Sequence, residues 1–151
     1  MKIFISHKST DATIASSVHQ EFKKLGVDAY LDLVDSFTGN GKKLTDHIKE
    51  QLNNCSDIIV VMSVNTKMSW WVPFEVGMSA QLDMPTASYL VANVDLPDYL
   101  SYWPRLKNLS DIAKYVATRN KVWRTDSMFE KRMVSGVTST DEFYRQLKAV
   151  L

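Results

Sequence analysis

Short apolar runs alternate along the chain with longer stretches in which apolar residues recur at helical spacing. The short runs are Ile3 to Ser6, Val27 to Leu31, Ile58 to Met62 and Ala87 to Val94. Short apolar runs that stop at polar residues are typical of buried strands in parallel sheets. The unbroken, β-branched run Ile58 to Met62 is the strongest of them, and we expect it at the centre of the sheet.

Apolar residues three and four positions apart indicate amphipathic helices between these runs and after the last one. The helices are expected at Ala12 to Leu25, at Leu44 to Asn54, from a Ser69 cap to before Pro85, and from Thr138 or Ser139 onward. Gly26 stands where a left-handed residue would end the first helix. Alternating strands and helices predict a doubly wound, flavodoxin-like α/β fold, with one parallel sheet and helices on both faces.

Two regions have weaker patterns. Asp32 to Lys43 contains Gly39-Asn40-Gly41 and almost no periodic apolar residue, which predicts an exposed loop. From Leu96 to Met133 the pattern indicates only a helix at Asp111 to Thr118 and a last strand at Lys121 to Arg124.

Composition indicates a single folded domain over residues 1–151, because 45% of the residues are hydrophobic and 23% are charged. Lys and Arg number 18 against 17 Asp and Glu, a balance that favours neither nucleic acid nor an anionic membrane. The first apolar run is too short for a signal peptide, and no run approaches the roughly 20 residues of a spanning helix. With Cys55 as the lone cysteine, we expect a cytoplasmic protein.

Common ligand motifs are missing from the sequence. It has neither G-x-x-x-x-G-K-[ST] nor G-x-G-x-x-G after the first strand, and His7, His19 and His47 are not at metal-ligand spacing. We therefore expect no metal and no resident cofactor. Ligands of such sheets bind at the carboxyl ends of strands, where His7 either faces a ligand or is a solvated loop residue.

Trp71 and Glu75 carry the chemistry suggested by the residues themselves. Four positions apart on one helix, they share a face, so an aromatic plate lies next to a carboxylate. A fixed negative group helps a positively charged base to leave a ribose, because it stabilises an oxocarbenium-like transition state. The alternative is that Trp71 is a core residue and Glu75 is a solvated first-turn residue near the helix dipole. Trp70 lies about 100° away from Trp71 around the helix, so only one of the two can share the face of Glu75, and Trp70 would matter mainly for stability if it packs inward.

Several segments together resemble the Toll/interleukin-1 receptor (TIR) domain. Phe4-Ile5-Ser6-His7 resembles its first box, Val27 to Asp32 its second strand, and the segment ending at Lys43 its BB loop. The most specific segment, Ser63 to Glu75, resembles the family signature S-x5-S-x-W-x3-E. The matches cover residues 3 to 94. They differ from the family in two ways: His7 replaces a usual Tyr, and the loop lacks the R-D-x-x-P-G pattern of receptor adaptors.

The resemblance implies an active site and a substrate. Glu75 would be the catalytic residue of an NAD-cleaving enzyme, with NAD as substrate rather than cofactor. The implied substrate-binding residues are Trp71, Ser6, His7, Lys8, Ser9, Asp32 and Leu44. The implied partners are other copies of the chain, in head-to-tail TIR–TIR self-association through the BB loop.

The resemblance to stand-alone bacterial TIR proteins further implies a role in antiviral defence. The enzyme would release nicotinamide and form ADP-ribose or a cyclic ADP-ribose messenger, which a separate effector protein reads. Sequence leaves hydrolysis and cyclisation both open. It also leaves two other functions open, a non-catalytic TIR interaction module and a nucleoside deoxyribosyltransferase-like enzyme.

Overall fold

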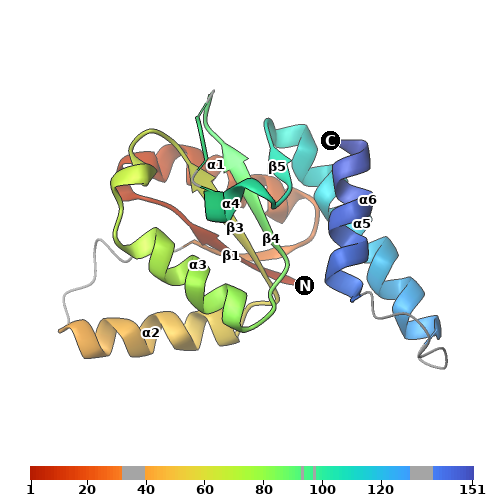
Figure 1. Ribbon diagram of the computed structural model, residues 1–151, viewed down its shortest axis with the longest axis horizontal. Coiled ribbons are helices and arrows are strands. Elements are labelled where there is room, and N and C mark those ends of the chain that lie inside the picture. The colour runs from red at the N-terminus through yellow and green to blue at the C-terminus, as the bar shows by residue number, and fades with distance from the viewer. Residues whose placement is uncertain (32–39, 93, 97, 130–137) are drawn as a thin grey trace.

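A parallel sheet forms the centre of the computed structural model, which describes residues 1–31, 40–92, 94–96, 98–129 and 138–151 (Figure 1). Its described strands are β1 (Lys2–Ser6), β2 (Asp28–Leu31), β3 (Asp57–Met62), β4 (Thr86–Leu90) and β5 (Arg105–Leu106). All neighbours pair in parallel in the order β2-β1-β3-β4-β5. This is the expected flavodoxin-like arrangement. β3 is at the centre, and the chain switches direction across the sheet between β1 and β3.

Helices cover both faces of the sheet, as the alternation of elements predicted. The helices are α1 (Ala12–Lys24), α2 (Gly41–Asn53), α3 (Trp71–Gln81), α4 (Asp98–Ser101), α5 (Leu109–Phe129) and α6 (Ser139–Val150), with 3-10 turns η1 (Ser9–Asp11) and η3 (Thr66–Met68). α1, α5 and α6 pack on one face, whereas α2, α3 and α4 pack on the other. Among the described residues, no helix is both long enough and apolar enough to cross a membrane.

Successive residues of each strand enter different cores, because side chains alternate across a sheet. Ile59 and Val61 of β3 join the core under α1, α5 and α6, whereas Ile58 and Val60 join the core under α2 and α3. All six residues of β3 are buried. This double coverage explains why the strand has no polar face in the sequence.

Local polar groups define where several elements begin and end. Gly26 follows α1 with φ of +72°, which confirms its predicted left-handed conformation. The Thr138 side chain caps α6 in a capping box with Asp141, which decides between the two starts, Thr138 and Ser139, that the sequence left open. Asn40 accepts a hydrogen bond from Lys43 N at 3.0 Å, so α2 begins at Gly41 rather than at Leu44. The predicted loop is therefore wrong at residues 41–43, and residues 32–39 lie outside the described residues.

The second half of the chain departs most from prediction. α5 runs unbroken through Lys121 to Arg124, so the strand predicted there is wrong, although the predicted helix at Asp111 to Thr118 lies within α5. The buried residues among the described side chains of α5 are Asp111, Ile112, Tyr115, Val116, Thr118, Arg119 and Val122. Because Arg119 occupies a core position, it interrupts the apolar period that would have indicated one long helix. β4 ends at Leu90, short of the predicted Val94, and β5 was missed because it has two residues.

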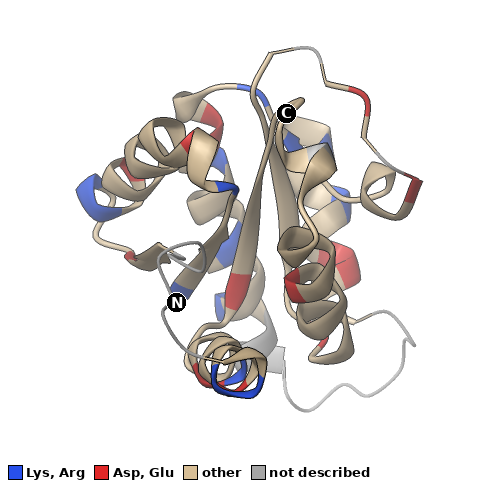
Figure 2. Ribbon diagram, turned by 90° about the vertical axis from the view of Figure 1, so that its left-hand side faces the viewer, with Lys and Arg blue, Asp and Glu red and all other residues tan. Residues whose placement is uncertain are grey.

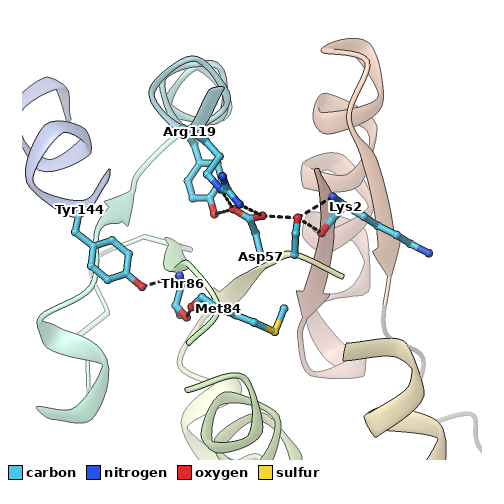
Figure 3. A network of polar contacts seen from close by, with 8 residues as sticks. Lys2, Asp57, Met84, Thr86, Arg119 and Tyr144 are labelled. Atoms are coloured by element: carbon cyan, nitrogen blue, oxygen red, sulfur yellow. Dashed lines mark hydrogen bonds and ion pairs between the residues drawn. The ribbon is translucent and has the colours of Figure 1, made fainter. Parts of the chain in front are cut away.

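A buried polar network attaches α5 to the start of β3 (Figure 3). Asp57 is fully buried, and the Arg119 guanidinium donates to its two oxygens at 2.7 and 3.3 Å. Tyr115 Oη donates a hydrogen bond to Asp57 at 2.9 Å, and Ser56 Oγ donates another to Asp57 at 2.6 Å. The guanidinium carbon also lies 3.1 Å from the centroid of the Trp123 ring. The buried carboxylate is therefore paired and hydrogen-bonded, which a buried charge requires.

A second contact in Figure 3 attaches α6 to β4. The backbone N–H of Thr86 donates to Tyr144 Oη at 2.8 Å. Burial raises the pKa of Tyr144 to about 12, so the phenol stays neutral at physiological pH.

The Asp57–Arg119 pair generates a prediction about stability. Arg119→Met removes the cation and leaves the Asp57 carboxylate buried, so we expect the free energy of unfolding to fall by about 3–5 kcal/mol. The double variant Asp57→Asn with Arg119→Met should recover part of this loss, because a neutral amide still accepts from Tyr115. Urea unfolding of both variants measures the difference. A double variant no more stable than Arg119→Met alone would contradict the interpretation.

Candidate active site

Ser6 and Glu75 meet at the carboxyl edge of the sheet. Ser6 is the last residue of β1 and is fully buried, and Glu75 of α3 is 1% exposed. The Ser6 hydroxyl donates a hydrogen bond to Glu75 Oε2 at 2.5 Å. The contact lies beside the switch point between β1 and β3, where doubly wound proteins bind ligands. The structure therefore brings together two of the residues predicted for the site.

Glu75 occupies a position that would normally be apolar. The buried residues of α3 are Val72, Glu75, Val76 and Ser79, which is the stripe that faces the sheet. Glu75 is the fifth residue of α3, in its second turn. The alternative interpretation of a solvated first-turn carboxylate is therefore wrong. Burying a carboxylate costs stability unless it is hydrogen-bonded, so such a residue is a candidate for function.

Ser69 fixes the beginning of α3. Its Oγ accepts hydrogen bonds from the backbone N–H groups of Trp71 and Val72, both at 3.3 Å. The predicted side-chain cap thus lies one residue before the N-cap position, which Trp70 occupies, and it satisfies donors at the helix start. Pro73 lies in the first turn, where a missing N–H is tolerated. The cap sets where Trp71 and Glu75 lie along the helix.

A second buried carboxylate, missed by the sequence analysis, holds the segment between β3 and α3. Asp11 is 4% exposed and accepts from Ser63 Oγ at 2.6 Å and from Thr66 Oγ1 at 2.9 Å. The Asn65 amide donates to its other oxygen at 3.4 Å. The pair Ser63-x-x-Thr66 is a local signal for a side-chain-stabilised turn. The partnership with Asp11 spans 52 positions and is visible only in the folded chain.

The adjacent tryptophans have different environments. Trp71 is half-buried, packs against the core under α2 and α3, and meets the Phe74 ring edge-on with centroids 5.9 Å apart. Trp70 precedes α3 and is 91% exposed. Trp70 therefore does not pack inward, which was the condition for a role in stability. Trp71 lies one turn before Glu75 and flanks the buried stripe, and its contact with a substrate stays a prediction.

The other predicted substrate-binding residues lie in different settings. His7 follows β1 and is 9% exposed, so it is not the solvated loop residue of one interpretation. Lys8 is half-buried and Ser9 is exposed at the start of η1. Leu44 is 8% exposed and packs in the core under α2 and α3. Asp32 lies outside the described residues.

Other reactive groups of the described chain offer weaker candidates. No group of three or more His, Cys, Asp or Glu side chains is placed to hold a metal ion there. Cys55 is half-buried after α2, and burial raises the pKa of its thiol to about 11. The thiol is therefore protonated at neutral pH and is a poor nucleophile.

The fold and this site define a class of protein, a doubly wound α/β domain with a buried carboxylate beside its switch point. Residues 3–133 match the TIR domain family, and the chain belongs to that family. No curated protein matches the sequence of this chain. The family includes members that cleave NAD and members that are not catalytic.

A solved structure agrees on the fold. The chain is similar to the TIR domain of the Toll-related receptor TRR-2 from Hydra magnipapillata, at 18% identity and a TM-score of 0.60, covering 82% of this chain and 95% of that one. It is also similar to the TIR domains of the activated Roq1 resistosome, which directly recognises the pathogen effector XopQ. That match has 15% identity and a TM-score of 0.48, and covers 99% of this chain and 82% of the other.

The different burial of the tryptophans predicts different effects on stability. Trp71→Ala removes packing against Phe74 and the core, so we expect a loss of about 2 kcal/mol and a fall in Tm of about 5 °C. Trp70→Ala should leave Tm within about 1 °C, because the side chain is solvated. Thermal unfolding by circular dichroism compares the two. Equal losses for both variants would show that the environments are not as described.

Proposed function

We propose that the chain is an NAD glycohydrolase or ADP-ribosyl cyclase whose catalytic residue is Glu75. One observation carries the proposal: a glutamate on the core-facing stripe of α3 is hydrogen-bonded to Ser6 beside the switch point. Scaffolding alone would be served better by an apolar residue at this position, because burying a carboxylate costs free energy. Membership of the TIR family favours NAD over a free nucleoside as the substrate.

In the proposed reaction Glu75 acts through its charge and position. The bond between nicotinamide and the anomeric carbon breaks, and its electron pair neutralises the positive charge of the nicotinamide ring. Glu75 binds the ribose hydroxyls and stabilises the developing oxocarbenium charge. This stabilisation lowers the activation free energy by about 3 kcal/mol. Trp71 offers a flat surface to the base.

The product depends on what reaches the anomeric carbon. Water adds there and loses a proton to give ADP-ribose, whereas a nucleophilic atom of the adenosine part gives a cyclic product. The Ser6 hydroxyl restricts rotation of the Glu75 carboxylate throughout, which is a positioning role. We further propose that the product is a messenger read by a separate effector in cytoplasmic antiviral defence.

The carboxylate generates the central functional prediction. Glu75→Gln keeps a group that can hydrogen-bond Ser6 but removes the negative charge, so nicotinamide release from NAD should fall by about two orders of magnitude. Glu75→Ala should also lower stability by about 1–3 kcal/mol, because it leaves the Ser6 hydroxyl buried without its acceptor. Chromatography of nicotinamide and thermal unfolding measure the two effects.

Matched controls separate chemistry from folding. Ser6→Ala should lower kcat more than it raises KM, because the positioning contact is lost while the charge remains. Glu50→Gln changes an exposed glutamate of α2 and should leave both activity and Tm unchanged. A Glu75→Gln protein with undiminished turnover would sink the assignment. A wild-type protein that exchanges the base of a deoxynucleoside and leaves NAD intact would favour the deoxyribosyltransferase alternative.

We also propose head-to-tail self-association, in which the Asp32 to Lys43 segment of one copy meets the start of α3 in the next. Exposed apolar side chains gather along the chain just before Glu75, at Val64 (69%), Met68 (76%), Trp70 (91%) and Phe74 (38%). Exposed apolar side chains that gather in this way mark interaction surfaces. This same feature would serve the alternative of a non-catalytic interaction module, which nicotinamide release distinguishes.

Self-association predicts activity that depends on concentration. Specific activity should rise with protein concentration, and Trp70→Ser should flatten the rise without changing Tm. Replacing Lys42 and Lys43 with Glu should have the same effect, whereas Lys23→Glu on α1 is the matched charge control. Activity is measured over a roughly hundredfold dilution series. Constant turnover per molecule would show that a single copy is the complete enzyme.

A further inference from the structure

A cavity lies at the ends of β4 and β5, and neither Ser6 nor Glu75 is among its described lining residues. It has a volume of about 640 Å³, and its walls come from the ends of β4 and β5, the segment after β4, α4 and the end of α6. Figure 1 shows the end of α6 beside β5 and the beginning of α5. The volume is within the range of small-molecule sites, roughly 300–1,000 Å³.

Three cationic side chains line this cavity: Arg105, Lys107 and Lys148. Each comes from a different part of the chain: β5, the segment after it and α6. None of the salt bridges within the described residues involves any of the three. Elsewhere both signs of charge are spread over the helices (Figure 2), and several surface cations there have acidic partners. Cations without acidic partners around one cavity form a local site for an anion.

Two of these cations are held in place by neutral groups. Arg105 Nη2 donates to the carbonyl oxygen of Ser101 at 3.2 Å, and Lys148 Nζ donates to the carbonyl oxygen of Tyr102. These bonds orient the side chains without neutralising them. Guanidinium and ammonium groups have five and three N–H donors respectively, so each retains donors for a ligand.

Negative groups at the cavity reduce the positive charge without cancelling it. Asp95 is among the lining residues and contributes one negative charge. The carboxyl end of α6 also borders the cavity at Leu151, where the helix dipole adds about half a negative charge and the main-chain carboxylate of Leu151 adds about one more. Against three cations, the balance within the described lining remains positive.

The remaining wall is largely apolar. Leu90, Val94, Trp103 and Pro104 line it, and Trp103 is 5% exposed. An apolar wall that faces a group of cations suits a ligand with a flat or apolar part and a phosphate-bearing part. Arginine and lysine both bind phosphate oxygens by charge-assisted hydrogen bonds.

We propose that this cavity, lined by Arg105, Lys107 and Lys148, is a binding site for a phosphorylated small molecule of the nucleoside diphosphate class. It shares none of its described lining residues with the Ser6–Glu75 site, so it does not depend on the proposed catalytic function. Ligand at this site would contact β4, β5, α4 and α6, all at the same edge of the sheet as Glu75. The site therefore offers a place where a nucleotide is sensed separately from the substrate.

The test uses ADP as the probe and the whole chain as the protein. Titration calorimetry gives the affinity, and heteronuclear NMR spectra show which backbone amides respond. We expect saturable binding, with the largest shifts at Val94, Arg105 and Lys107, and weak or no binding of adenosine. The variant Arg105→Ala with Lys107→Ala should raise the Kd about tenfold, since two charge contacts are lost.

The controls make each outcome decisive. Lys23→Ala with Lys49→Ala removes two exposed cations on α1 and α2 and should leave the Kd unchanged, and Lys148→Ala tests the site independently of Arg105. ADP shifts confined to Ser6 and Glu75 would overturn the proposal, because ADP would then occupy only the candidate active site. Adenosine binding as tightly as ADP, or cavity variants that bind like the wild type, would overturn it as well. Glu75→Gln changes no lining residue of this cavity, so ADP binding there should be the same in that variant. The proposed NAD cleavage and the proposed nucleotide site can therefore be refuted independently of each other.

Discussion

The rest of the structure depends on the complete burial of β3, because polar groups at both ends of this strand must be satisfied inside the protein. At its start, the Asp57 carboxylate accepts hydrogen bonds from Arg119, Tyr115 and Ser56. After its end, Ser63 donates to the buried carboxylate of Asp11. The first set of contacts fixes α5, and the second fixes the turn that leads to α3. Satisfying one central strand thus places the helices on both faces of the sheet.

The two ends of the sheet differ in what their buried charges can do. In doubly wound folds ligands bind at the carboxyl ends of the strands, so the Asp57–Arg119 pair at the opposite end is structural. Glu75 lies at the carboxyl edge and meets Ser6 there. A carboxylate in a partly dry setting exerts a stronger field than one in water. The burial that makes Glu75 costly for folding is therefore what would make it effective toward a developing positive charge.

The sequence predicted those elements in which the spacing of apolar residues and the residues that begin or end the element indicate the same structure. β1 to β4, α1, α3 and α6 follow from such agreement, helped by Gly26, Ser69 and Thr138 at helix ends. β5 was too short to have a period, and α5 was obscured because Arg119 takes a core position. The site was predicted in part: spacing placed Trp71 and Glu75 on one helix, but the contact with Ser6 joins residues 69 positions apart. Contacts of that range depend on strand order, which local patterns do not encode.

Arg119 and Glu75 both show that local sequence patterns do not reveal long-range contacts. Both are charged residues on the core-facing stripe of a helix, so each interrupts the apolar period that would mark its position as buried. Each is stable there because a partner from a distant strand or loop meets it, Asp57 for Arg119 and Ser6 for Glu75. A charged residue that breaks an otherwise apolar stripe thus indicates a tertiary partner, and its position relative to the carboxyl edge distinguishes a structural pair from a candidate for chemistry. By that criterion, Glu75 rather than Arg119 is the candidate for chemistry, in line with the function that we propose.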